Sequence, residues 1–169
     1  MMTAADVIEV VEVLEAAGVD VWLDGGWAVD ALISEQTRDH GDLDLVVRSE
    51  DANRAISVLE PSGYVMNLDA RPTRFVLAGA QGRRIDFHPV VFSETGDAVQ
   101  KGAGPNGGDA PFPASGFTGR GTVAGLPVAT LSPGLLVLFH IGYQPQDKDR
   151  HNVRLLCERF AILLPPAYL

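Results

Sequence analysis

Two aspartates, Asp42 and Asp44, have the residue type and spacing in this chain that most clearly predict chemistry. They are followed by the apolar run Leu45, Val46 and Val47, which is typical of a buried strand. Side chains two positions apart in a strand point to the same face, so both carboxylates are expected to face one point. Like charges this close repel each other unless a cation lies between them. Oxygen ligands of this kind suit Mg²⁺, which takes one or two carboxylates and fills its other positions with substrate phosphates.

A third carboxylate, Asp86, lies between Ile85 and Phe87 in a second predicted strand. If this strand pairs beside the first one, three carboxylates line one cleft. Two of them could hold Mg²⁺ on a nucleoside triphosphate, and the third could accept a proton from an incoming hydroxyl or add to metal binding. His88 should share the face of Asp86, where it could contact the acceptor or tune Asp86. A structural hydrogen bond is the alternative for His88.

The phosphate side of the site is predicted by Gly25 and Gly26, a short distance upstream. Glycines let the backbone approach a phosphate closely, and the helix expected over 27–33 offers free N–H groups at its N-terminus. Arg38 and His40 come just before the acidic strand and could donate hydrogen bonds to the triphosphate. Packing within the loop is the alternative for His40. The combination, in this order, predicts a nucleotide site beside a metal site.

The elements that must position these residues follow from periodicity and turn residues. Helices are expected where apolar residues share a helical face or where Ser, Thr and Pro mark a start, and strands where apolar runs lie between turns. The predicted helices are 3–17, 27–33, 50–59, 132–143 and 147–163. The predicted strands are 19–23, 43–47, 64–68, 74–78 and 84–92, with a hairpin over 122–130 and a long Gly- and Pro-rich loop over 101–121. Strands interleaved with helices and hairpins predict an α/β (α+β) fold with a mixed β-sheet.

Length and composition indicate one globular domain and exclude several classes of function. The chain has 169 residues and a net charge of −9. Acidic proteins repel phosphate backbones, so no broad nucleic-acid surface is expected; a cationic small substrate is compatible, although acidity that serves only solubility is the simpler interpretation. The longest apolar run, 135–139, is too short to span a bilayer, so no membrane contact is expected. A single cysteine, Cys157, and no basic N-terminal segment predict a cytoplasmic protein.

Two longer runs of the sequence resemble the small antibiotic nucleotidyltransferases of the DNA polymerase beta-like superfamily. They are Trp-Leu-Asp-Gly-Gly-Trp-Ala-Val-Asp over 22–30 and Thr-Arg-Asp-His-Gly-Asp-Leu-Asp over 37–44. The resemblance is to lincosamide nucleotidyltransferases and their aminoglycoside-modifying relatives in particular. It continues through 86–89 and 138–143, so it covers most of the chain. Gly41 departs from the pattern, since a larger and often basic residue is expected at that position.

The resemblance implies a fold and a reaction. The fold would be a nucleotidyltransferase sheet flanked by helices, in a single domain over 1–169 with the catalytic sheet in 1–130 and a C-terminal helical part in 131–169. The reaction would transfer a nucleoside monophosphate, AMP from ATP, to a hydroxyl of a small-molecule antibiotic and release pyrophosphate. Some acceptor sites in this superfamily form between subunits, so a homodimer is compatible with the resemblance.

The resemblance also implies roles for individual residues. Asp42, Asp44 and Asp86 would be Mg²⁺ ligands, and Asp86 would also be the candidate base. The triphosphate would meet the glycine pair and Arg38. Independently of the resemblance, the position of Tyr143 at the turn into the last helix makes it a candidate for lining the acceptor pocket together with His88, although a solvated helix start is the simpler interpretation.

Two other functions fit the same residues. The protein could be a minimal nucleotidyltransferase that modifies a protein or RNA partner, as in toxin–antitoxin pairs, although the acidic charge argues against RNA. It could also be a non-catalytic nucleotide-binding domain that retains the fold. The intact set of three acids makes this last interpretation the weakest.

Overall fold

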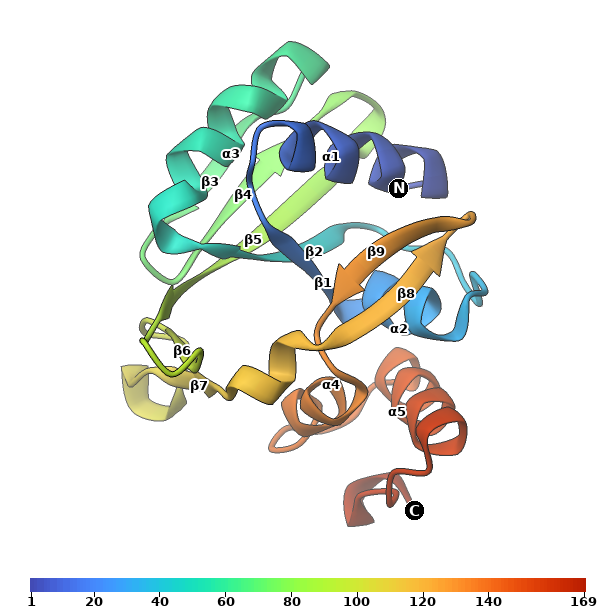
Figure 1. Ribbon diagram of the computed structural model, residues 1–169. Helices are drawn as coiled ribbons and strands as arrows, with labels where there is room; N and C mark the ends of the chain where they lie inside the picture. Colours follow the sequence, from blue (N-terminus) through green and yellow to red (C-terminus); the bar gives the residue numbers. More distant parts are fainter.

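The computed structural model describes residues 1–169, and its centre is one mixed β-sheet flanked by helices (Figure 1). The strand order is β3-β4-β5-β2-β1-β9-β8, with β6 paired to β5 and β7 paired to β6. The strands are β1 Val21–Asp24, β2 Leu43–Arg48, β3 Val65–Ala70, β4 Arg74–Ala78, β5 Arg84–Phe92, β6 Ala98–Gln100, β7 Ala110–Phe112, β8 Gly119–Val123 and β9 Leu126–Thr130. The helices are α1 Ala4–Ala16, α2 Gly25–Ile33, α3 Ala52–Leu59, α4 Pro133–Phe139 and α5 Asp147–Phe160. The predicted mixed α/β architecture is confirmed.

The middle of the sheet is formed by β1, β2 and β5. Strand β2 is antiparallel to β1 and parallel to β5. Its side chains Leu43, Leu45, Val46 and Val47 are fully buried, and burial of each such side chain stabilises the fold by about 1.5–3 kcal/mol. Asp44 interrupts this apolar run and stays partly exposed. The core therefore fixes the backbone on both sides of Asp44.

The helices cover the sheet in two groups. Helices α1 and α3 contact each other, and α1 also contacts β1 and β8, whereas α3 contacts β3 (Figure 1). Helix α2 contacts β2, β8, α4 and α5, so the two C-terminal helices lie beside the helix that follows the glycine pair. The predicted start of α1 is confirmed, because Asp6 N–H donates to Thr3 Oγ1 at 3.2 Å and Thr3 N–H donates to Asp6 Oδ2 at 2.8 Å.

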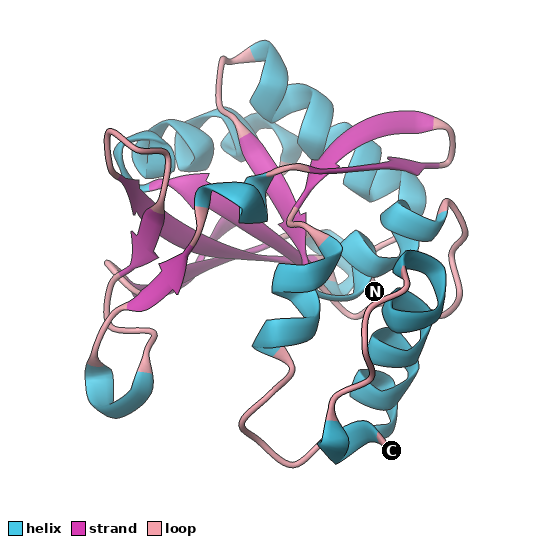
Figure 2. Ribbon diagram, turned by 60° about the horizontal axis from the view of Figure 1, so that its bottom comes forward, coloured by secondary structure: helices cyan, strands magenta, loops and turns pink.

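The prediction of a loop over 101–121 is wrong in its extent. Strand β7 lies within it and forms a hairpin with β6, which ends just before it (Figure 2). An ion pair of 2.7 Å between Lys101 Nζ and Asp109 Oδ2 closes this hairpin. Phe112 and Phe117 are buried, and Phe117 packs against Trp22 with ring centroids 5.0 Å apart. This aromatic packing orders a segment whose Gly and Pro content by itself indicates a loop.

The last two helices are shorter than predicted. Helix α4 begins at the predicted Ser132 cap, whose Oγ accepts from Leu135 N–H at 3.3 Å, but it ends at Phe139 rather than near residue 143. Helix α5 ends at Phe160 rather than at residue 163, because Ala161 adopts the left-handed conformation with a φ of 53°. Both ends lie within a few residues of the prediction, as is usual for helix boundaries.

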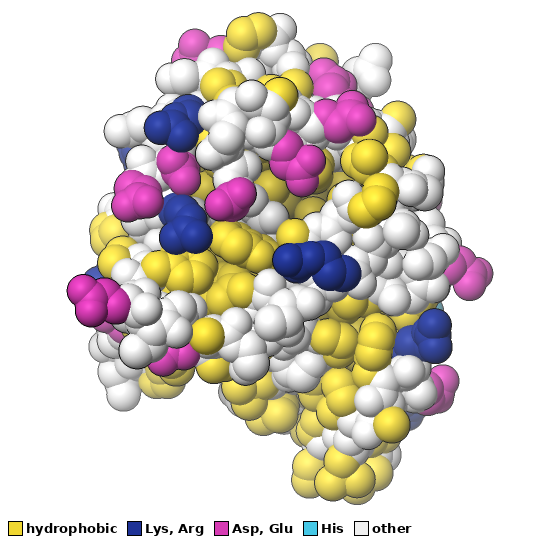
Figure 3. All heavy atoms as spheres, viewed as in Figure 1, with side chains coloured by type: hydrophobic (Ala, Val, Ile, Leu, Met, Phe, Trp, Pro, Cys, Tyr) yellow, Lys and Arg dark blue, Asp and Glu magenta, His cyan; other side chains and the backbone are white.

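None of the helices combines the length and the apolar character of a membrane-spanning segment. On the face shown in Figure 3, Lys and Arg side chains stand singly among Asp and Glu side chains and form no continuous basic area. A nucleic-acid surface would need such an area, so this face does not provide one.

Candidate active site

Three aspartates lie side by side on the three central strands. Asp24 ends β1 and pairs in register with Asp44 on β2, and Asp44 pairs in register with Asp86 on β5. The parallel pairing of β2 with β5 is the arrangement that the sequence analysis required for Asp44 and Asp86. Asp24 has no role in the sequence-based prediction, although its position directly before the glycine pair is a signal for a helix N-cap. Its Oδ1 accepts from Gly25 N–H at 2.7 Å.

Asp44, Asp86 and His88 form what we call the β2–β5 cluster. One possible ligand atom from each of the three lies within 4.8 Å of the others. Asp86 Oδ2 pairs with Arg74 Nη2 at 3.0 Å, whereas the buried Asp86 Oδ1 has no hydrogen-bond partner. An unsatisfied buried carboxylate oxygen is costly unless a ligand or an ion meets it. The cluster therefore has a free oxygen ligand in the position predicted for a cation.

Asp42 lies just outside the β2–β5 cluster. It precedes β2 and its side chain is exposed. Its charge is nevertheless close enough to raise the pKa of Asp86. Asp42 is thus a neighbour of the cluster at the open end of the same strand, and an exposed aspartate there is free to turn toward an ion.

Burial and neighbouring charges shift the pKa values of the central groups. Burial raises the pKa of Asp86 above its ordinary value, and the charges of His88 and Arg74 only partly offset this. Burial also raises the pKa of Asp24, to which the neighbouring charge of Asp44 adds. Burial by itself would lower the pKa of His88, but its hydrogen bond to Asp44 and the surrounding carboxylates raise it. A carboxylate with a raised pKa is a better proton acceptor.

The glycine pair forms the turn between β1 and α2, next to Asp44. Gly25 has a φ of 59°, in the left-handed region, and a Cβ at this position would collide with Asp44 Oδ2. A Cβ on Gly26 would collide with Arg38 Nη2 and with His40 Nδ1. Both positions therefore require glycine, and the backbone of the turn is directly accessible to these three side chains.

Arg38 carries a positive charge beside this turn without a carboxylate partner. Its Nη1 donates to Asp39 O at 3.1 Å, and its buried Nε has no partner. A guanidinium presents a planar set of donors that suits phosphate oxygens. The unused donors next to a glycine turn fit the predicted contact with a triphosphate.

His40 is buried behind the same turn and is held by a chain of hydrogen bonds. Its Nε2 lies 2.6 Å from Asp30 Oδ2, and Asp30 Oδ1 accepts from Thr37 Oγ1 at 2.7 Å. Thr37 Oγ1 in turn lies 2.8 Å from His151 Nε2 on α5. Because a carboxylate only accepts, Nε2 of His40 carries a proton and only Nδ1 is directed to Gly26. Both sequence-based alternatives for His40 thus have a structural basis, one for each ring nitrogen.

The remaining predicted residue, Tyr143, lies apart from the β2–β5 cluster. It is half exposed in the connection between α4 and α5, and Asp149 and Tyr168 are its charged and polar neighbours. Two residues of the cluster's surroundings, Arg74 and Gln100, were missed by the sequence analysis. Both come from strands that pair antiparallel with β5, and nothing in the sequence around either residue marks it as a neighbour of the cluster.

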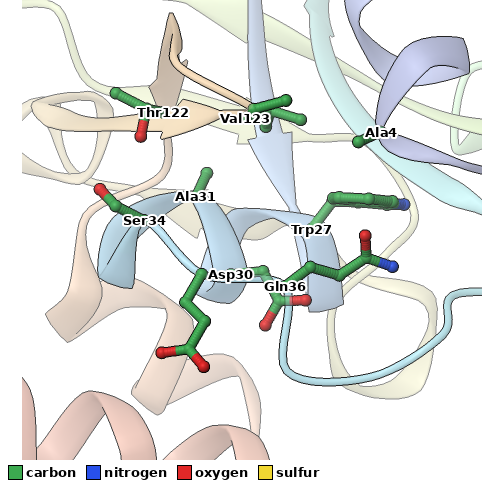
Figure 4. A pocket seen from close by; sticks show the side chains of 10 residues that line it. Ala4, Trp27, Asp30, Ala31, Ser34, Gln36, Thr122 and Val123 are labelled. Atoms are coloured by element: carbon green, nitrogen blue, oxygen red, sulfur yellow. The ribbon is translucent and has the colours of Figure 1, made fainter.

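A cavity of about 180 Å³ lies on the other side of α2 (Figure 4). It is lined by Trp27, Asp30 and Ala31 of α2 and by Thr122 and Val123 of β8, among others. No member of the β2–β5 cluster lines it. The cavity shares Asp30 with the hydrogen-bond chain that holds His40, and the predicted chemistry does not take place in it.

Comparisons with known proteins agree with this geometry. A family model described as aminoglycoside-2''-adenylyltransferase matches residues 6–156. A lincosamide resistance protein of Staphylococcus haemolyticus is 28% identical over 155 residues, which is 92% of this chain and 94% of that protein. The crystal structure of the lincosamide antibiotic adenylyltransferase LnuA with lincomycin bound has a TM-score of 0.81 and 27% identity, covering 96% of this chain and 99% of that one. The structure of ANT(2'')-Ia with adenylyl-2''-tobramycin has a TM-score of 0.73 at 19% identity, over 93% of this chain and 88% of that one, and shows the fold alone.

Proposed function

The chain belongs to the aminoglycoside-2''-adenylyltransferase family of antibiotic adenylyltransferases, and we propose that it transfers AMP from ATP to a hydroxyl of a lincosamide. The observation that carries the proposal is the in-register pair Asp44 and Asp86 beside the Gly25 turn, with a free oxygen on Asp86. Neither a macromolecular acceptor nor a non-catalytic role has an observation of this kind in its favour.

The residues of the cluster fit Mg²⁺. Asp44 and Asp86 offer carboxylate oxygens close together, and Asp86 Oδ1 is buried without a partner. We propose Asp42 and Asp44 as the residues that hold the ion, with Asp42 turning in from the open end of β2, and Asp86 as the third carboxylate, whose free Oδ1 faces the acceptor. When bound, the ion supplies positive charge that neutralises the phosphate oxygens and orients them.

The phosphates are bound by the chain's own donors in this proposal. The glycine turn brings the backbone N–H groups at the start of α2 to the triphosphate. Arg38 contributes its free guanidinium donors, and His40 lies beside them with Nδ1 at Gly26. The proton on Nε2 of His40 is already held by Asp30 at 2.6 Å. The ring is therefore oriented before the nucleotide arrives.

Asp86 is the proposed base. Its raised pKa makes its carboxylate a stronger proton acceptor than an exposed aspartate. The acceptor oxygen forms a bond to the α-phosphorus, and the bond from this phosphorus to the bridging oxygen of pyrophosphate breaks. The hydroxyl proton passes to Asp86, and pyrophosphate leaves with the bridging oxygen and its electron pair. Arg74 on Asp86 Oδ2 fixes the carboxylate so that Oδ1 faces the reacting atoms.

The choice of a lincosamide over an aminoglycoside follows from the two more similar proteins. The resistance protein and the LnuA structure match nearly the whole chain at 28% and 27% identity. The aminoglycoside enzyme matches at 19%, which supports the fold only. An aminoglycoside is the second candidate acceptor, and the family description favours it.

Pyrophosphate release from ATP and Mg²⁺ with a panel of lincosamides and aminoglycosides tests this proposal. We expect turnover with lincomycin and its relatives, and much slower turnover with aminoglycosides. The reverse order would assign the second candidate. Turnover that survives Asp42→Ala combined with Asp44→Ala would refute the mechanism for either acceptor.

A further inference from the structure

We infer that Gln100 is a positioning residue that holds His88 as its Nε2–H tautomer and thereby keeps the imidazole nitrogen out of the metal site. Gln100 ends β6 and is buried, with 8% of its surface exposed. The inference deepens the proposed function, on which it rests for the presence of an ion at Asp44, beside Asp86.

The side-chain amide of Gln100 has one possible orientation. Its nitrogen Nε2 lies 2.8 Å from Thr73 O, a backbone carbonyl in the turn between β3 and β4. Because a carbonyl only accepts, this atom must be the amide nitrogen; the opposite orientation would place two oxygens against each other. One of the two amide hydrogens is therefore used by Thr73.

The second amide hydrogen determines the tautomer of His88. Gln100 Nε2 lies 3.3 Å from His88 Nδ1. An amide nitrogen donates and does not accept, so Nδ1 must be the acceptor and carries no hydrogen in the neutral ring. The hydrogen of neutral His88 is then on Nε2, which lies 3.3 Å from Asp44 Oδ1 and donates to it.

With this tautomer, the two oxygens of Asp44 have different surroundings. Oδ1 receives the His88 hydrogen bond, and Oδ2 lies against Gly25 in the phosphate turn. The carboxylate is thus oriented with one oxygen toward the place where an ion would meet the triphosphate. Partners of this kind orient a metal ligand without touching the metal.

The tautomer also decides which ligand atoms an ion would find. With Nε2 protonated, His88 offers no lone pair to the cluster, and the remaining ligands are all carboxylate oxygens, as Mg²⁺ prefers. With the hydrogen on Nδ1 instead, Nε2 would present a lone pair beside Asp44 and Asp86. An imidazole nitrogen in that position favours Zn²⁺ and similar ions. Gln100 therefore acts on metal selectivity through His88.

The tautomer can be read directly by ¹⁵N NMR of the ring nitrogens of His88, in the metal-free protein at a pH where the ring is neutral. We expect the Nε2–H form in the wild type and in Gln144→Leu, a control that removes an exposed amide. Gln100→Leu should give a mixture of tautomers. Gln100→Glu, which keeps the shape of the side chain and can accept from Nδ1–H, should give the Nδ1–H form. An Nδ1–H form in the wild type, or an unchanged tautomer in both Gln100 variants, would overturn the inference.

Metal selectivity gives a second and independent measurement. Calorimetric titration of the metal-free protein with Zn²⁺ should show about 10–100-fold tighter binding in Gln100→Glu and Gln100→Leu than in the wild type, with the larger gain in Gln100→Glu. Unchanged Zn²⁺ affinity in folded variants whose tautomer has changed would refute the role in selectivity. If the wild type shows the expected tautomer but transfers no AMP, the proposed function fails while the assignment of Gln100 to the His88 tautomer stands.

Discussion

Asp44 and Asp86 occupy paired positions on the parallel strands β2 and β5, so two carboxylates that are far apart in the sequence meet in one cluster. The register depends on the buried residues on either side of Asp44. A slip of one residue would turn Asp44 to the opposite face of the sheet. The core thus fixes the spacing on which the proposed chemistry depends.

Replacing Asp86 by Asn should lower kcat by about 10²–10⁴-fold, the usual contribution of a positioned base. Asn keeps an oxygen for Arg74 but cannot take the proton of the acceptor. Affinity for ATP should change little, because Arg38 and the glycine turn remain. Steady-state kinetics and nucleotide titration measure the two effects. A kcat within twofold of that of the control Asp147→Asn, which removes an exposed carboxylate on α5, would show that Asp86 is not the base.

Replacing Arg38 by Ala should raise the KM for ATP by about 10–100-fold. A hydrogen bond to a charged group contributes about 1.5–3 kcal/mol, and each 1.4 kcal/mol is a factor of ten in affinity. Arg159→Ala removes the same charge from an exposed position on α5 and should leave the KM unchanged. Equal effects of the two substitutions would mean that Arg38 acts only through the overall charge of the protein.

Replacing Gly26 by Ala should also raise the KM for ATP, because the new Cβ displaces Arg38 and His40 from the turn. Gly134→Ala in α4 is the control, since its Cβ meets no atom within 4 Å. That control should stabilise α4, in which Gly134 is exposed, by up to about 1 kcal/mol. Kinetics and thermal unfolding of both variants separate the two effects, and a Gly26→Ala enzyme with wild-type KM would contradict the assignment of the turn.

Replacing Asp24 by Asn should stabilise the metal-free protein at neutral pH. Burial raises the pKa of Asp24 above its ordinary value of 3.8, so the folded state binds this proton more tightly than the unfolded state does. The free energy of unfolding therefore decreases as pH rises from 3.8 through the raised pKa. The contribution of protonated Asp24 to stability is fully present only below pH 3.8. Asn keeps the oxygen that accepts from Gly25 N–H and removes the titration.

Urea unfolding of wild type and Asp24→Asn across this pH range, without divalent ions, measures the difference. The variant should show a flatter pH dependence than the wild type. Asp20→Asn, at an exposed position, should follow the wild-type curve. A pH profile of Asp24→Asn that also follows the wild-type curve would show that Asp24 does not contribute to the pH dependence.

Much of the fold and half of the site could be predicted because their signals are local. The Asp42–Asp44 spacing, the apolar run after it and the glycine pair each lie within a few residues of one another. The strands β4 and β5 begin and end where the sequence predicts. Local alternation and turn residues suffice for such elements.

The rest depends on which side chains meet across paired strands and between elements, and no local pattern carries that information. Gln100 meets His88 only because β6 pairs with β5, and the strand β7 that completes this hairpin lies in a segment whose Gly and Pro content indicates a loop. Arg74 reaches Asp86 across the pair formed by β4 and β5. The support of His40 by Asp30 and Thr37 is likewise visible only once the chain is folded.

The central claim is that Asp44 and Asp86 form a Mg²⁺-dependent adenylyl-transfer site, and mass spectrometry of the reaction product tests it most directly. Wild-type protein incubated with ATP, Mg²⁺ and lincomycin should yield lincomycin carrying one AMP, with one pyrophosphate released for each product. Removal of the metal by a chelator, or Asp44→Asn together with Asp86→Asn, should abolish the product. An adenylylated antibiotic formed at the wild-type rate by that double variant, or none formed by the wild type with any lincosamide or aminoglycoside, would contradict the account.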